Sequence, residues 1–85
     1  MNCILDLSGH RIWKDKHINP EGKEIYAYLY TNGFGKTISH MNIGDIQHIL
    51  RIRNKGLKNN LEKLQDNNYI RFNEYDTGMY EYYIC

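Results

Sequence analysis

The sequence contains few cysteines and no long apolar run. Its two cysteines, Cys3 and Cys85, stand at opposite ends of the chain without metal-ligand spacing. We therefore expect two reduced thiols, with a disulfide between the termini as the alternative. No apolar stretch approaches the length that spans a bilayer, and no basic-then-apolar leader opens the chain. These absences predict a cytoplasmic protein that does not enter a membrane.

Signatures of catalysis are also missing. None of the four histidines stands near Cys, Asp or Glu at a spacing typical of a metal site or of a nucleophile with its base: His10, His17, His40 and His48. Asp45 and His48 lie three residues apart, which indicates an exposed pair on a helix rather than a catalytic pair. No two carboxylates are placed for hydrolysis. We therefore expect no enzyme, no metal site and no cofactor.

What is present is an ordinary globular composition with unevenly distributed charge. The 85 residues are 41% hydrophobic and 25% charged, which is typical of one domain over residues 1–85 with a single core. Residues 51–63 carry five basic side chains against Glu62 alone, whereas residues 66–85 carry four acidic side chains against Arg71. A local basic patch attracts phosphates, although a charged cluster on a small helix is more often only a solvated face.

Residues 42–70 have the clearest pattern. Two groups of apolar residues recur at helical spacing: Ile43, Ile46, Ile49 and Leu50 in the first, and Leu57, Leu61 and Leu64 in the second. The corner between the groups contains Ile52 as its single apolar residue. The pattern predicts helices over residues 42–50 and 54–67, capped by Asn42 and Asn54 and joined as in a helix-turn-helix.

An earlier helix is predicted over residues 19–32. Asn19 is suited to the N-cap and Pro20 to the first helical position. The expected buried stripe consists of Ile25, Tyr28 and Leu29. Tyr26 and Tyr30 fall off that stripe, so they are predicted at its rim or at a contact with a second subunit.

The segments before and after this helix carry weaker signals. Residues 1–18 predict a short extended lead-in from which Trp13 packs onto the core, with an exposed Trp13 at an interface as the alternative. Residues 33–41 predict a loop and then a brief extended piece at Lys36 to Ser39. The string GFGKT lacks the full spacing of a phosphate-binding loop, so that function is not expected here.

Residues 69–85 predict a hairpin of two strands. The turn is indicated by Asp76-Thr77-Gly78, with glycine where a positive φ is needed. Ile70 and Phe72 are expected to face inward on the first strand. On the second strand either alternate set is compatible with burial.

The order helix, short strand, two helices and hairpin resembles the winged helix-turn-helix superfamily. The stretch from Met41 to Ile70 matches its pattern without a gap, with Ile52 at the turn and Tyr69 at the entry to the wing. The resemblance implies an α+β, mainly α, fold of three helices plus a C-terminal β-hairpin wing. Arg51 and Asn68 stand where the superfamily usually has glycine.

The stretch IWKDKHINPEGKEIYAYLYTNG is similar to the opening of the N-terminal domains of DnaD-like phage or plasmid replication-initiation proteins. This resemblance, which spans residues 12–75, implies a role in DNA replication or in transcription regulation. Members of that family commonly continue into further domains, so the resemblance implies either the N-terminal domain of a longer protein or a stand-alone reduced protein, with a replication protein as a further partner.

In a winged helix, the N-terminal half of the second helix of the pair normally reaches base edges in the major groove. The predicted partner is double-stranded DNA, with the helix over residues 54–67 in that groove. Candidate base or groove contacts are Asn54, Lys55, Lys58 and Asn59. Candidate phosphate contacts are Arg51, Arg53 and Lys63, together with Arg71 on the wing.

A protein-interaction winged helix that does not bind DNA is the competing hypothesis. The near-neutral net charge, the acidic wing and the eight tyrosines favour it, because tyrosine supplies contact area at low entropic cost. A homodimer and a docked partner both fit this hypothesis, and self-association is also compatible with DNA binding. The candidate interface residues are Trp13, Tyr26, Tyr30, Tyr80 and Tyr83.

Overall fold

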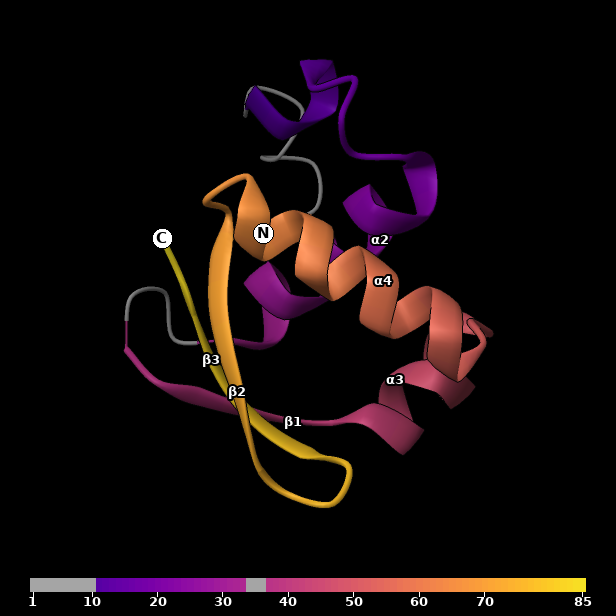
Figure 1. Cartoon of the computed structure of the whole chain (residues 1–85), viewed down its shortest axis with the longest axis vertical. Helices are drawn as coiled ribbons and strands as arrows, with labels where there is room; N and C mark the ends of the chain where they lie inside the picture. Colours follow the sequence, from indigo (N-terminus) through magenta and orange to yellow (C-terminus); the bar gives the residue numbers. More distant parts are fainter. Residues whose placement is uncertain (1–10, 34–36) are drawn as a thin grey trace.

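The computed structural model describes residues 11–33 and 37–85. Within these residues the chain forms a short 3-10 helix, three α-helices and three strands: η2 (Arg11–Lys14), α2 (Pro20–Asn32), β1 (Ser39–Asn42), α3 (Ile43–Leu50), α4 (Asn54–Asp66), β2 (Ile70–Asp76) and β3 (Met79–Ile84). The strands form one antiparallel sheet of order β1-β3-β2, and α2 and α4 lie to one side of it (Figure 1). The expected α+β, mainly helical fold with a C-terminal hairpin is confirmed.

The segment that precedes α2 does not have the extended conformation that was predicted for it. Residues 1–10 lie outside the described residues, and Arg11–Lys14 form a 3-10 helix. Ile12 and Ile18 are the residues of this segment that enter the core, since their side chains are 1% and 3% exposed. Trp13 is instead 36% exposed, so the prediction that it packs into the core is wrong.

Helix α2 begins where the capping signals placed it. The Asn19 side chain accepts a hydrogen bond of 2.7 Å from the Gly22 N–H, and Pro20 occupies the first turn. The buried surface of α2 is wider than the predicted stripe. Tyr26 is only 5% exposed and its ring packs edge-on against Tyr69, with the ring centroids 5.6 Å apart. The prediction that Tyr26 lies off the buried stripe is therefore wrong, because a distant segment covers a second side of α2.

Helices α2 and α4 approach each other closely at Gly22. A Cβ atom at Gly22 would lie 2.9 Å from Ile18 Cγ2 and 3.1 Å from Asn60 Oδ1, so no larger residue fits without displacing one of them. Asn60 is 6% exposed and completes the junction. Its Nδ2 donates hydrogen bonds of 2.9 Å to Glu21 Oε1 on α2 and to the Gly56 carbonyl on its own helix. This junction determines how α4 is presented to the surface.

Helix α3 starts after Asn42, whose side chain accepts a hydrogen bond from the Asp45 N–H, as expected. Ile43 and Ile46 are buried, and Leu50 is half-buried against the core. Ile49 is 56% exposed, so its predicted place in the buried group is wrong. An eight-residue helix that packs along one side has room for only part of its apolar residues.

The hairpin of β2 and β3 turns at Thr77-Gly78, where Gly78 has φ 74°. The structure decides which side of β3 faces inward: Tyr80, Tyr82 and Ile84 are 5%, 2% and 6% exposed. The Tyr82 hydroxyl donates a hydrogen bond of 2.9 Å to the Leu29 carbonyl of α2. This bond connects the central strand of the sheet to the first α-helix of the described chain.

Candidate nucleic-acid interface

The turn between α3 and α4 is compact. Arg51 has φ 57° and ψ 45°, the left-handed region, and its N–H bonds to the Gln47 carbonyl. The Ile52 N–H bonds to the same carbonyl at 3.1 Å, and the Ile52 side chain is 7% exposed. The turn therefore needs the positive φ that glycine usually supplies, and a non-glycine residue adopts it at an energetic cost.

The first turn of α4 has no side-chain cap. Asn54 was expected to be the cap, but it is the first helical residue, and Arg53 occupies the cap position without a side-chain hydrogen bond. The first turn also contains no acidic residue. The amide groups at this helix end therefore carry their partial positive charge at a surface already populated by basic side chains.

The buried stripe of α4 matches its prediction. Leu57, Leu61 and Leu64 are all 0% exposed, which turns the opposite side of the helix to solvent. Every candidate DNA-contacting residue is exposed: Arg51, Arg53, Asn54, Lys55, Lys58, Asn59, Lys63 and Arg71. Asn60, which sequence reasoning missed, is the buried polar member of α4.

Two adjoining hollows lie along the edge of α4 that faces the start of α2. The first, of about 470 Å³, is lined by Arg51, Arg53 and Lys55 among others. The second, of about 380 Å³, is lined by Lys16, His17 and Lys63 among others. Glu21, Gly56 and Asn59 line both hollows, so the two adjoin each other along α4.

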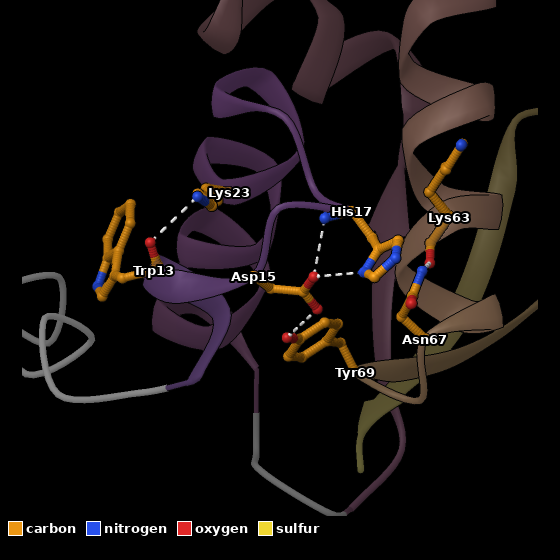
Figure 2. Close-up of polar contacts among 7 residues, drawn as sticks. All are labelled: Trp13, Asp15, His17, Lys23, Lys63, Asn67 and Tyr69. Carbon is orange, nitrogen blue, oxygen red and sulfur yellow. Dashed lines mark hydrogen bonds and ion pairs between the residues drawn. The ribbon is translucent and has the colours of Figure 1, made fainter.

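A hydrogen-bonded cluster lies beside the second hollow (Figure 2). One oxygen of the Asp15 carboxylate accepts the His17 N–H at 2.8 Å and lies 3.0 Å from His17 Nδ1. The other oxygen accepts the Tyr69 hydroxyl at 2.6 Å. The bond from Tyr69, and then that from the His17 amide, lower the pKa of Asp15 to about 2. The carboxylate is therefore charged at neutral pH, and the exposed His17 ring lies beside it.

This cluster is a histidine–carboxylate contact that the sequence analysis did not single out. Asp15 and His17 stand two residues apart in the sequence, a spacing that brings them together once the chain turns after η2. Tyr69 is distant in sequence, and the core brings it to Asp15. The signal available in the sequence was therefore the Asp15-x-His17 spacing alone.

The wing is acidic and its acidic groups are engaged locally. The Thr77 N–H donates to Asp76 Oδ1 at 2.8 Å, and the Gly78 N–H donates to Glu74 Oε2 at 3.1 Å. Arg71 is the basic residue of β2 and lies exposed. The tip of this wing therefore presents carboxylates, with Arg71 further along β2.

The candidate interface residues divide into two groups. Tyr26 and Tyr80 are each 5% exposed, so their assignment to an intermolecular interface is wrong. Both are enclosed by the core, and Tyr80 packs beside Phe72. Trp13 and Tyr83 are 36% and 38% exposed, and Tyr30 is half-buried.

The described residues also bear on the expectations for metal ligands, cysteines and membrane-spanning helices. Among residues 11–33 and 37–85, no group of three or more His, Cys, Asp or Glu side chains is placed to hold a metal ion. Cys85 is an exposed free cysteine, whereas Cys3 and most of the glycine-rich string at residues 33–37 fall outside those ranges. No helix in the same ranges is long and apolar enough to span a bilayer.

Three helices followed by a hairpin within a three-stranded sheet make the described fold winged-helix-like. Comparisons of the chain with models of protein families, with curated proteins and with solved structures give no match. Winged-helix domains serve several functions, so the function of this chain must be argued from its own surface chemistry.

Proposed function

We propose that the protein binds double-stranded DNA, with α4 in the major groove. The proposal rests on one observation: the exposed side of α4 and the turn before it carry five basic side chains, and none of them forms an ion pair with a carboxylate that the structure describes. Among the side chains that the structure describes in residues 12–33 and 37–85, the only ion pair is that of His17 with Asp15, so no lysine or arginine of residues 51–63 is in an ion pair there. Such a surface attracts the phosphate backbone of DNA.

The placement of residues on α4 suits the two kinds of contact that DNA offers. Lys55, Lys58 and Asn59 project from the N-terminal half of the helix, and their types match the donor and acceptor patterns of guanine and adenine. Arg51 and Arg53 flank the start of the helix, where they suit backbone phosphates. We assign Arg71 a lesser role, because the carboxylates of the wing tip oppose a phosphate.

A salt titration of duplex binding tests the proposal. The four candidate phosphate contacts predict that log K falls with log salt with a slope of about −3 to −4, since each contact contributes about 0.9. A variant with Lys55→Glu and Lys58→Glu should lose binding. The matched control reverses two charges away from α4, Lys14→Glu and Lys23→Glu, and should retain most of it. Absence of binding to a random duplex at low ionic strength would refute the proposal.

Self-association is the second candidate function. A hollow of about 480 Å³ is lined mainly by apolar surface from Trp13, Tyr28 and Leu50, and Ile49 is exposed on the adjacent helix α3. A second copy of the chain would remove this surface from water. Sedimentation equilibrium with the Trp13→Ala variant as the control tests it: a mass of one chain at high concentration in the unaltered protein excludes the dimer.

A further inference from the structure

The hollow at the far end of α4 is a second basic site on the same helix edge. Lys16 and His17 come from the segment between η2 and α2, and Lys63 comes from α4. All three side chains are exposed, and the His17 side chain is 82% exposed. Asn59 lines this hollow and the one beside Arg51 and Arg53, so the two basic ends belong to one continuous surface.

The separation of the two ends matches the geometry of duplex DNA. Eight residues separate Lys55 from Lys63, which on an α-helix corresponds to about 12 Å along the axis. The major groove of B-DNA is about 12 Å wide between its two backbones. A helix that meets one backbone near Arg51 and Arg53 therefore brings Lys16, His17 and Lys63 toward the other.

The contact with Asp15 favours one tautomer of the His17 ring. The Asp15 carboxylate is ionised and can only accept hydrogen bonds, so His17 Nδ1, 3.0 Å away, carries a hydrogen. In the neutral ring, Nε2 then has a lone pair and repels a phosphate oxygen. In the protonated ring, Nε2 carries a hydrogen and donates to it. Figure 2 shows the ring between Asp15 and the turn of α4 that contains Lys63.

From this arrangement we propose that Lys16, His17 and Lys63 form a second phosphate site for the bound duplex, and that His17 contributes to it only when protonated. The inference rests on the proposed function, and it adds a regulation of that site by pH. The ligand is a backbone phosphodiester of the strand opposite the one met by Arg51 and Arg53. Binding takes up one proton on His17, so affinity rises as the pH falls.

The charges that face His17 come from every neighbouring element. Asp15 and Lys16 belong to its own segment, Glu21 belongs to α2, Lys63 belongs to α4, and the Tyr69 hydroxyl reaches Asp15 from the chain before β2. Glu21 accepts a hydrogen bond from the Asn60 side chain, and Asp15 accepts hydrogen bonds from Tyr69 and His17, but these bonds do not cancel the carboxylate charges. The two lysines therefore balance the two carboxylates, and protonation of His17 makes the surroundings of the hollow net positive and attractive to phosphate.

The test compares pH profiles of duplex affinity at constant ionic strength. Histidine is the side chain that ordinarily changes charge between pH 5 and 8. Affinity of the unaltered protein should rise about five- to tenfold from about pH 8 to about pH 5.5, the effect of one charge-assisted contact at a surface. His17→Gln should bind like the unaltered protein at the upper pH and show no rise. His40→Gln is the matched control, because His40 lies on the sheet against Tyr75 and should leave the profile unchanged.

The salt dependence supplies a second measurement that a purely structural role of His17 would not change. The slope of log K against log salt should be steeper by about 0.9 at the lower pH in the unaltered protein, and equal at both pH values in His17→Gln. A flat pH profile in the unaltered protein, or an unchanged rise in His17→Gln, overturns this inference and leaves duplex binding by α4 standing. Absence of duplex binding at every pH overturns both the proposed DNA binding and the proposed role of His17.

Discussion

Arg51 is a position where one substitution is expected to raise stability and weaken DNA binding together. Its φ of 57° and ψ of 45° place an L residue in the left-handed region, which costs roughly 1–2 kcal/mol. Glycine avoids this cost but increases the entropy of the unfolded chain, which offsets about 0.5–1 kcal/mol. The net expectation for Arg51→Gly is a gain of about 0.5–1 kcal/mol in the free energy of unfolding.

For a domain of this size, 1 kcal/mol shifts the Tm by about 4–8 °C, so Arg51→Gly should melt about 2–8 °C higher than the unaltered protein. Thermal unfolding followed by circular dichroism measures the shift. Arg51→Ala is the matched control, because it removes the same charge but keeps a Cβ atom at positive φ. The alanine variant should be no more stable than the unaltered protein.

Both variants lose the guanidinium group, so both should bind duplex DNA more weakly, with a salt slope reduced by about 0.9. Equal melting temperatures for the glycine and alanine variants would refute the argument that the backbone conformation at Arg51 costs stability. Duplex affinity equal to that of the unaltered protein would instead remove Arg51 from the candidate phosphate contacts. The two measurements therefore separate the structural from the functional part of the prediction.

Two further predictions concern the polar contacts around α2 and α4. Asn60→Ala removes both side-chain hydrogen bonds of this residue and should lower the free energy of unfolding, measured in urea, by about 1–3 kcal/mol. The control Asn59→Ala, at an exposed position, should change it by less than about 0.5 kcal/mol. Equal effects of the two variants would contradict the claim that Asn60 joins α4 to α2. The folded pKa of Asp15, about 2 against an ordinary 3.8, means that its stabilising contribution is complete above the ordinary pKa and is lost as pH falls toward 2. The difference in stability between the unaltered protein and Tyr69→Phe should therefore shrink as the pH falls from about 3.8 to about 2. A difference in melting temperature that stays constant between pH 7 and pH 2 would show that the Tyr69 hydrogen bond does not depend on the charge of Asp15.

The sequence by itself determined the features that depend on neighbouring residues. Asn19 and Pro20 start α2 because a cap and a fixed φ act within one helical turn. The leucines of α4 identify its buried side because helical spacing alone places them together. The positive φ of Gly78 at the hairpin turn was recognisable because glycine adopts such a conformation easily.

The exposed side of α4 followed from the same local reasoning. Once its leucines are assigned to the core, the lysines of this helix together with Asn54 and Asn59 are expected to face solvent, and they do, whereas Asn60 is buried. The cap of α4 was displaced by one residue, because Arg53 takes the cap position without using its side chain. Propensity favours asparagine at a cap, but the cap of α4 falls one residue earlier than Asn54.

Only the tertiary structure decided the features that depend on distant partners. Helical spacing indicates which side of a helix is buried but not how wide that side is, so Tyr26 was misplaced until Tyr69 was seen to cover it. The Tyr69 bond to Asp15 depends on the core to bring together residues far apart in sequence. The second basic site likewise exists because α2 and α4 pack closely enough at Gly22 to bring His17 beside α4.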